Sequence, residues 1–364
     1  MSLRRAALAL LLLPLAACAK EKPPDDFCLT GTLAYDFHDA EDGPEKPAAT
    51  APAHNANWEL WGGPTGSVEM LSTGRTGADG SFRACHRGRF AEVHLTFRSA
   101  SGALWQVVTD ETARQQYSFE SVGIAPSPLG ELDLGRLEAP ETIAGAWRIV
   151  DTLNLLYDKR ANPDSTCWTR RQDDGHCEPL TMVWTPADDD EAGYFDQEAG
   201  LVVLAGDMPD SEHLILHEAG HWFQWQLYGH WLPETVGCEI HYIEEHTSPT
   251  CAWVEGFPDA LAAYASGDDR YVYEDGIEAP LDGSTSWATG EAVQGRVAGT
   301  LVDLWAPNGP DGGNWDGTIE VMSRVRSSTF LEYFYIARPM ALPPLSTTGE
   351  AAAIVRGHTI KVEG

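Results

Sequence analysis

The sequence His217-Glu218-Ala219-Gly220-His221 places two histidines four residues apart, with a glutamate next to the first. On a helix, residues i and i+4 lie one turn apart on the same face, so both imidazoles can bind one metal ion. The glutamate can then hold the water molecule bound to that ion. The flanking sequence favours a helix, because Pro209–Glu212 carries an N-cap signal and no proline follows before Tyr228. We therefore expect a metal-binding helix here.

A third metal ligand is expected downstream of this motif. Zinc in a catalytic site usually takes three protein ligands and leaves one position for water. The segment Ala252–Tyr264 predicts a second helix that begins near Glu255, because Pro258 is tolerated only in a first turn. Glu255 and Asp259 then share one face. Glu255 can bind the metal, and Asp259 can accept the second N–H of a ligand histidine and fix its tautomer.

These two segments resemble the gluzincin metallopeptidases, zincins in which a glutamate from a downstream helix is the third zinc ligand. Trp253-Val254-Glu255-Gly256-Phe257 and the four-residue spacing from Glu255 to Asp259 look like the patterns of that group. The resemblance covers about residues 200–265. It implies hydrolysis of peptide or protein substrates with one catalytic Zn²⁺, and assigns His217, His221 and Glu255 as ligands, Glu218 as general base and Asp259 as the partner of a ligand histidine.

The sequence leaves two questions about this site open. Such enzymes use a tyrosine or a histidine to stabilise the oxyanion, and the candidates are Tyr264, Tyr271, Tyr273, His230, His241 and His246. The alternative to a peptidase is a catalytically inactive, surface-anchored binding lipoprotein on a zincin scaffold. A zinc hydrolase that cleaves another kind of bond also fits, because a ligand set does not name the bond.

The first residues of the chain have the features of a bacterial lipoprotein signal peptide, predicted over residues 1–17. Arg4 and Arg5 precede an apolar run that is too short to span a bilayer. Leu15-Ala16-Ala17-Cys18 resembles a lipobox, which implies that Cys18 is diacylated and becomes the first mature residue. An ordinary secretory signal is the alternative. Residues 18–27 read as a polar tether. We expect an exported protein, held by lipid alone at the periplasmic face or cell surface.

Charge and cysteine content narrow the class of protein further. The formal net charge is −31, so nucleic acid and anionic membrane surfaces would repel the chain, and neither is expected as a partner. Seven cysteines fit an oxidising compartment. With Cys18 assigned to lipid, six remain and sequence alone leaves their connectivity open. Proximity in sequence favours the pairs Cys167–Cys177, Cys238–Cys251 and therefore Cys28–Cys85.

The expected fold class is α+β, with a β-sandwich over residues 28–138. Short strands separated by turns support this: Val93–Phe97 and Leu104–Val108 predict a hairpin. The Trp58–Trp61 strand and the Thr76–Phe82 turn resemble transthyretin-like or carboxypeptidase-regulatory-like modules, which are non-catalytic spacers.

Residues 141–364 are expected to form a zincin-like, mainly helical domain with a small sheet. Apolar residues recur at helical spacing over residues 142–157 and 290–305. The apolar runs 180–184 and 201–206 predict strands, and the second ends just before the metal-binding helix.

Overall fold

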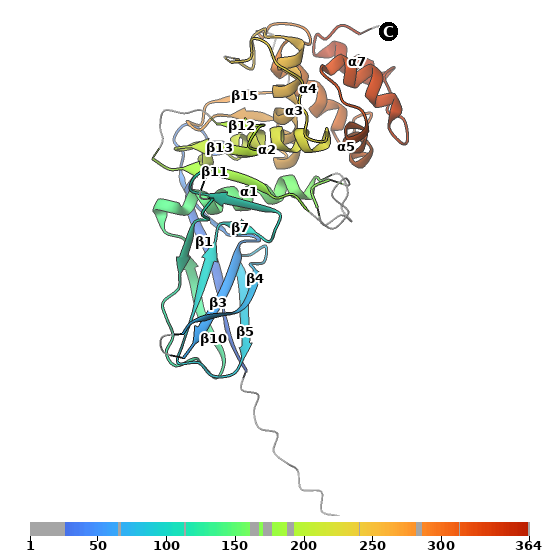
Figure 1. Cartoon of the computed structure of the whole chain (residues 1–364). Coiled ribbons are helices and arrows are strands. Elements are labelled where there is room, and N and C mark those ends of the chain that lie inside the picture. The colour runs from blue at the N-terminus through green and yellow to red at the C-terminus, as the bar shows by residue number, and fades with distance from the viewer. Residues whose placement is uncertain are drawn as a thin grey trace, which may run out of the picture.

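The computed structural model describes residues 26–64, 67–112, 114–160, 167–169, 177–187, 193–239, 241–281, 286–312 and 314–362. The predicted signal peptide and Cys18 lie outside the described residues. A β-rich region with several sheets is followed by a mainly helical region with a small sheet, which confirms the α+β class (Figure 1). Within the described part of the chain, no helix combines the length and apolar character needed to cross a membrane.

The elements follow one another in chain order as Figure 1 labels them. The strands are β1 (Asp26–His38), β2 (Ala48–Pro52), β3 (Asn57–Gly63), β4 (Glu69–Arg75), β5 (Ser81–Arg87), β6 (Glu92–Arg98), β7 (Ala100–Ser101), β8 (Trp105–Val108), β9 (Ser118–Glu120), β10 (Gly130–Glu138), β11 (Leu180–Thr185), β12 (Tyr194–Asp196), β13 (Leu201–Ala205), β14 (Arg270–Val272) and β15 (Glu278–Pro280). The α-helices are α1 (Ala144–Asp158), α2 (Glu212–Leu227), α3 (Pro249–Ser266), α4 (Gln294–Trp305), α5 (Trp315–Arg324), α6 (Phe330–Glu332) and α7 (Glu350–Gly357). Shorter helical turns are η1 (Ala40–Asp42), η2 (Glu141–Ile143), η4 (Met208–Asp210), η5 (Tyr333–Ala337) and η6 (Arg338–Met340).

Two four-stranded sheets make up most of the β-rich region. One has the order β10-β1-β2 with β5 also paired to β1, and the other has the order β4-β3-β6-β9. Alternate residues of β3 are buried, among them Trp58 and Leu60, as expected for a strand with one face on a core. The rings of Phe82 on β5 and Phe97 on β6 meet with centroids 5.3 Å apart, so the two sheets pack face to face.

A five-stranded sheet, ordered β12-β13-β11-β8-β7, lies under the metal-binding helix and draws strands from both regions. β11 and β13 are buried along almost their whole length and run parallel, as apolar runs covered on both faces do. The predicted hairpin of Val93–Phe97 with Leu104–Val108 is wrong. β6 pairs with β3 and β9, whereas β8 pairs with β7 and β11, because the chain crosses between sheets after Arg98.

Helix α1 joins the two regions through one continuous apolar core. Trp105 on β8 donates a hydrogen bond from Nε1 to the Val150 carbonyl of α1 (3.1 Å). Tyr35 on β1 donates to an Asp151 carboxylate oxygen (2.7 Å), and the ring of Phe119 meets that of Trp147 at 5.3 Å. The β-rich region is therefore packed against the helix that supports the metal-binding helix.

The second metal-binding helix begins earlier than its sequence suggests. We expected a start near Glu255 with Pro258 in the first turn, but α3 spans Pro249–Ser266 and Pro258 lies inside it. Ser248 is the N-cap residue, since its hydroxyl accepts a hydrogen bond from the Cys251 N–H (3.1 Å), and Pro249 occupies the first turn. The start signal is thus Ser248-Pro249, six residues upstream of the predicted one.

The six cysteines of the folded part form the three predicted disulfides: Cys28–Cys85, Cys167–Cys177 and Cys238–Cys251. Cys28 and Cys85 face one another across the antiparallel pair β1–β5. Cys238–Cys251 instead ties a loop to the first turn of α3.

Candidate metal centre

Helix α2 presents the two histidines of the motif on one buried face. Its start is set by Ser211, whose hydroxyl accepts a hydrogen bond from the Leu214 N–H (3.1 Å). His217 and His221 follow at one-turn spacing and are 4% and 7% exposed. The helix and its N-cap signal agree with the prediction, because both depend on residues close together in the chain.

Small residues bring α2, α3 and α4 close enough for their side chains to converge. A Cβ at Gly220 of α2 would lie 2.9 Å from the Cβ of Pro258 on α3. A Cβ at Gly256 of α3 would lie 2.8 Å from the Gln294 carbonyl oxygen on α4. Contacts this short leave no room for a larger residue at either glycine, so both are required for the spacing of the helices.

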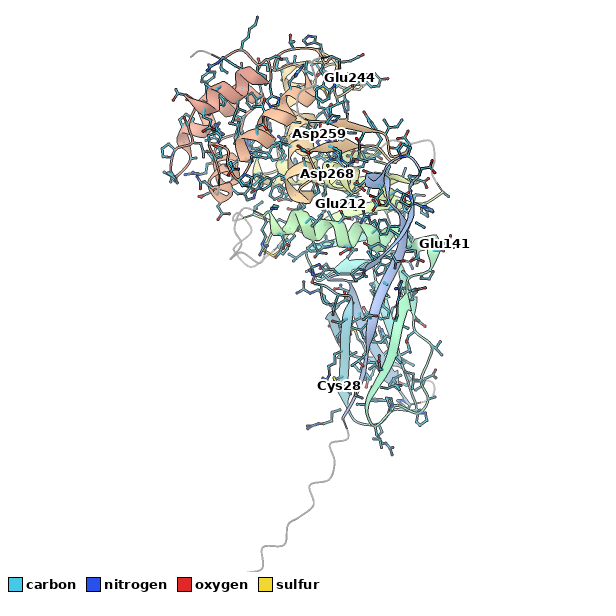
Figure 2. All side chains as sticks on the ribbon, turned by 180° about the vertical axis from the view of Figure 1, so that it is seen from behind. Cys28, Glu141, Glu212, Glu244, Asp259 and Asp268 are labelled. Atoms are coloured by element: carbon cyan, nitrogen blue, oxygen red, sulfur yellow. A yellow bond between two sulfur atoms is a disulfide. The ribbon has the colours of Figure 1, made fainter. Side chains whose placement is uncertain are left out.

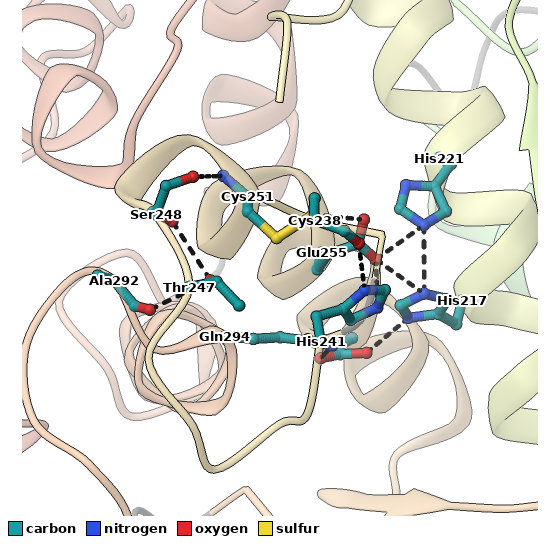
Figure 3. The surroundings of a disulfide bond; sticks show 11 residues. His217, His221, Cys238, His241, Thr247, Ser248, Cys251, Glu255, Ala292 and Gln294 are labelled. Atoms are coloured by element: carbon teal, nitrogen blue, oxygen red, sulfur yellow. Dashed lines mark hydrogen bonds and ion pairs between the residues drawn. A yellow bond between two sulfur atoms is a disulfide. The ribbon is translucent and has the colours of Figure 1, made fainter. Parts of the chain in front are cut away.

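His217, His221 and Glu255 point at one common centre (Figure 3). The two Nε2 atoms are 3.2 Å apart, and Glu255 Oε2 lies 3.5 Å from His217 Nε2 and 3.3 Å from His221 Nε2. A tetrahedral zinc ion with bonds of about 2.1 Å separates its ligand atoms by about 3.4 Å. Each of the three ligand-to-ligand distances therefore fits a zinc ion, and two imidazoles with one carboxylate form a donor set that zinc accepts.

Asp259 holds His217 in the orientation that metal binding needs. An oxygen of Asp259 accepts a hydrogen bond from His217 Nδ1 (2.5 Å), so the other ring nitrogen, Nε2, is directed at the common centre. The other oxygen accepts from Gln294 Nε2 (2.8 Å). Asp259 is fully buried, so the predicted role as partner of a ligand histidine has the required geometry.

A second buried group, His213 with His217 and Asp259, also has its ligand atoms close together. His213 Nε2 lies 3.7 Å from the Asp259 carboxylate. His217 and Asp259 are however already joined by a short hydrogen bond, and neither His213 nor Asp259 lines the cleft described below. The group formed by His217, His221 and Glu255 is therefore the better metal site.

The ligands and Asp259 have shifted pKa values because they are buried together. Burial alone would lower the pKa of His217, but the Asp259 carboxylate and the Glu255 carboxylate raise it well above its ordinary value. Burial would raise the pKa of Glu255, but the neighbouring histidines hold it well below its usual range. Burial likewise opposes ionisation of Asp259, yet His217 and His213 lower its pKa to about 2.

Glu218 lies at the cleft beside the ligands. The cleft has a volume of about 590 Å³ and is lined by all three ligands, by Glu218 and by the edge strand β12. Glu218 Oε2 is buried and has no hydrogen-bond partner among the described residues, and burial raises the pKa of its carboxyl. A Cβ at Gly193 would lie 3.1 Å from Glu218 Oε1, so the glycine leaves space for this carboxylate.

Three of the six candidates for the oxyanion-stabilising residue line the cleft: His241, Tyr271 and Tyr273. The other three do not line the cleft: Tyr264 stacks on Trp315, His230 stacks on Trp225, and His246 lies where the backbone forms an isolated β-bridge with Val293. His241 is the nearest to the ligands, with Nε2 3.4 Å from Glu255 Oε2.

His241 is tied to the neighbouring Cys238–Cys251 disulfide; the pairing of the two cysteines was predicted from the sequence, but the contact with His241 was not. His241 Nδ1 donates to the Cys238 carbonyl (2.9 Å), and Cys238 is bonded to Cys251 on α3, one turn before Glu255 (Figure 3). The hydrogen bond to Glu255 and that carboxylate's charge raise the pKa of His241 to about 9.

Two residues near the ligands, Gln294 and His213, were not predicted from the sequence. Gln294 donates to Asp259 from α4, and His213 lies one turn before His217 on the same face of α2. The i, i+4 spacing of His213 and His217 was a usable signal, whereas nothing in the sequence links Gln294 to Asp259.

Comparison with known proteins identifies the family. Residues 161–359 match the Mycolysin C-terminal domain and residues 28–146 match the Mycolysin middle domain. No curated protein matches this chain. Among solved structures, a 9R-lipoxygenase from Cyanothece PCC8801 is 14% identical with a TM-score of 0.22; the match covers 62% of this chain and 29% of the lipoxygenase.

An (S)-allantoin synthase is 14% identical with a TM-score of 0.18, over 32% of this chain and 42% of that chain. This chain thus spans well under two thirds of either structure, and similarities this weak carry no argument. The domain matches cover most of the chain and include every residue of the metal centre. The chain belongs to the mycolysin family, and this membership together with the buried His/His/acid group suggests a zinc metallopeptidase of the zincin type.

Proposed function

We propose that the protein hydrolyses peptide bonds with one zinc ion held by His217, His221 and Glu255, in the manner of the gluzincins. The observation that carries the proposal is the spacing of the three ligand atoms, 3.2 to 3.5 Å apart at the floor of an open cleft. When bound, the zinc polarises the scissile carbonyl and makes a water molecule acidic enough to attack it.

The side chains around the ligands supply the remaining parts of the reaction. Glu218 takes the proton of the attacking water through its unpartnered oxygen and passes it to the leaving amine. Asp259 keeps His217 in the tautomer that binds metal. Of the cleft residues, His241, Tyr271 and Tyr273 can donate to the oxyanion. The edge strand β12 offers backbone groups to an extended substrate.

Two variants with opposite effects on zinc test the proposal. Glu218→Gln is expected to retain stoichiometric zinc but to lower kcat about 10³-fold, because only the base is lost. His217→Ala is expected to lose both zinc and activity. The measurements are metal content by mass spectrometry and cleavage of an unbiased peptide library, with and without chelator. Unchanged turnover in Glu218→Gln removes the proposed base. Stoichiometric zinc without any cleavage by the wild type favours the inactive binding scaffold.

We further propose that the protein is exported and anchored through acylated Cys18, with residues 18–27 as a tether to a β-sandwich spacer (28–138) and a peptidase domain (141–364). The three disulfides support an extracellular setting. Lipidation itself stays a prediction from the lipobox-like sequence, since Cys18 lies outside the described residues. Membrane fractionation tests it: Cys18→Ser is expected to move the protein to the soluble fraction, and an unchanged distribution contradicts the anchor.

A further inference from the structure

A second cavity opens beside the metal cleft and shares a wall with it. It has a volume of about 370 Å³. We call it the side cavity; its lining includes Tyr242, Tyr271, Tyr273, Glu274, Asp275 and Gln294. Five residues line both cavities: His241, Tyr242, Tyr271, Tyr273 and Glu274. A peptide bound across the metal centre can therefore place one neighbouring side chain in the side cavity.

The lining of the side cavity combines aromatic rings with negative charge. Tyr271 and Tyr273 are two residues apart at the end of β14, so they point to the same side, and their ring centroids are 4.6 Å apart. Burial, followed by the carboxylates of Glu244, Asp259, Glu274 and Asp275, raises the pKa of Tyr273 to about 12. A negative potential of this kind favours a cation at the same place.

Among the described residues that line the side cavity or the cleft, none is a lysine or an arginine. Arg270 precedes Tyr271 on β14 and is therefore directed to the opposite side of the strand, where it binds Asp268 and Glu278. The basic side chain of the lining is His241, and it faces the Glu255 carboxylate (3.4 Å), so the described residues of the lining offer no lysine or arginine to the carboxylates of Glu274 and Asp275.

Gln294 contributes to the side cavity a hydrogen-bond acceptor, Oε1, for which the described residues provide no donor. Its side chain is buried, with the residue 2% exposed, and it lies beside His241 (Figure 3). Because the Asp259 carboxylate can only accept, Gln294 must turn its Nε2 toward Asp259, and its Oε1 has no hydrogen-bond partner among the described residues. A buried acceptor without a donor is costly. A ligand group rich in N–H donors would satisfy it.

The wall of the side cavity is held in place by the β-rich region. Glu274 and Asp275 lie in the turn between β14 and β15, and Asp275 accepts a hydrogen bond from the Ile277 N–H (2.9 Å). A Cβ at Gly276 would lie 2.4 Å from the Gly43 carbonyl carbon, so the turn packs directly against the β1–β2 connection. The turn that carries Glu274 and Asp275 is therefore held in position by its contact with the β1–β2 connection.

We propose that the side cavity is a specificity subsite for a lysine or arginine side chain of the peptide substrate. The tyrosine rings pack against the aliphatic stem and attract the cation, and Glu274 and Asp275 receive the charged end. A glutamate in the substrate is repelled, and a purely apolar side chain leaves the carboxylates and Gln294 Oε1 without a donor. The inference rests on the proposed peptidase function only in taking a peptide as the ligand.

Binding to a zinc-loaded Glu218→Gln chain tests the subsite without catalysis. The probes are N-acetylated, C-amidated peptides that differ at one position, scanned along the peptide, with lysine, arginine, norleucine or glutamate. At one position lysine and arginine are expected to bind about tenfold more tightly than norleucine, with glutamate weakest. Adding Glu274→Gln and Asp275→Asn should reduce that ratio severalfold, whereas Glu245→Gln, on the same loop as Tyr242 and outside the lining, should keep it. Equal or tighter binding of norleucine at every position overturns the inference.

Cleavage of the same peptides by the wild-type chain separates this inference from the proposed function. Basic selectivity in binding with no cleavage of any peptide contradicts the peptidase and leaves the subsite intact. Cleavage that is sensitive to chelator but indifferent to lysine, arginine and norleucine supports the peptidase and overturns the subsite. Peptides with a free N-terminus form the last comparison: if the free amine, and not the side chain, determines affinity, the cavity is a terminal-amine site and the inference is wrong.

Discussion

The β-rich region and the helical region bury different kinds of side chain. In the described part of residues 26–138 the buried interior holds apolar residues and a few hydroxyl groups; no Asp, Glu, Lys, Arg or His is fully buried, although Glu41 is partly buried where it meets the helical region. The helical region buries several charged groups, and two of their arrangements differ in kind. Arg338 and Asp311 satisfy one another in a two-pronged ion pair (2.5 and 2.7 Å). His217, His221 and Glu255 instead converge on a single centre. A buried pair can be purely structural, whereas two imidazoles and a carboxylate that converge on one point form a donor set suited to a metal cation.

The two regions also differ in what their disulfides hold together. Cys28 lies at the end of the β-rich region far from Asp259 (Figure 2), while Cys238–Cys251 lies beside the ligands (Figure 3). We therefore expect loss of the Cys28–Cys85 bond to lower stability alone, and loss of the Cys238–Cys251 bond to lower both stability and activity.

Among the changes considered for stability, removing either of these two disulfides is expected to lower the unfolding free energy most. Replacing Cys28 and Cys85 by serine opens a loop with a sequence separation of 57, and chain entropy predicts a loss of about 4 kcal/mol of unfolding free energy. Replacing Cys238 and Cys251 opens a separation of 13, with an expected loss of about 3 kcal/mol. Only the second variant should also lower kcat/KM, by about tenfold or more, because His241 and the first turn of α3 lose their anchor.

Urea unfolding and peptide cleavage, both carried out where the variants are folded, measure the two effects. A fall in kcat/KM for the serine variant of Cys28 and Cys85 equal to that of the other variant contradicts the separation of the two regions.

The Asp259 carboxylate gives a smaller, local effect within the helical region. Asp259→Asn keeps the shape but weakens the hydrogen bond that orients His217, and zinc affinity should fall about 10- to 100-fold with the fold retained. Competition with a fluorescent chelator measures the affinity, and circular dichroism checks the fold. Asp269→Asn, on an exposed residue just past α3, is the matched control. Identical zinc affinity in the Asp259 variant and the control would falsify the orienting role.

The features that the sequence predicted depend on contacts between residues close together in the chain. The features that it missed depend on contacts between residues far apart in the chain. Three features were predicted because they depend on residues no more than 13 positions apart: the motif helix, its N-cap signal and the pairing of nearby cysteines. The start of α3 is also set locally, by Ser248-Pro249, but the expectation that Pro258 must lie in a first turn placed the predicted start near Glu255. Pro258 is tolerated inside the helix where α3 packs against Gly220 of α2, a contact that sequence alone does not show.

The missed features depend on segments that are far apart in the chain. β8 leaves the sandwich to pair with β11, about 75 residues downstream, so the pattern of residues 93–108 could not distinguish a hairpin from a crossing between sheets. Gln294 reaches Asp259 only because Gly256 lets α4 approach α3. Helical periodicity indicates which face of a helix is buried, but not which polar residue it meets there.

The last prediction concerns Glu41, which lies where the β-rich region meets the helical region, and the pH dependence of stability. Glu41, in the β1–β2 connection, accepts a hydrogen bond from the His213 N–H at the start of α2 (3.1 Å) and lies 3.7 Å from Arg148. Burial, aided by the nearby Glu212, raises the pKa of Glu41 to about 7, although the His213 N–H and Arg148 act in the opposite direction. The raised value means that ionised Glu41 is less favourable in the folded protein than in the unfolded chain.

This pKa fixes the sign of a pH effect on stability. Between the ordinary value of 4.5 and about 7, the folded protein retains a proton that the unfolded chain has released, so the contribution of Glu41 to the unfolding free energy falls as pH rises through this window. Glu41→Gln cannot titrate. The stability of this variant relative to wild type should therefore rise by about 2–3 kcal/mol from pH 5 to pH 8. Thermal or urea unfolding at the two pH values measures it, with exposed Glu45→Gln in the same connection as control. If the difference in unfolding free energy between Glu41→Gln and wild type is the same at both pH values, the pKa of Glu41 is the same in the folded and the unfolded chain. That result contradicts the prediction.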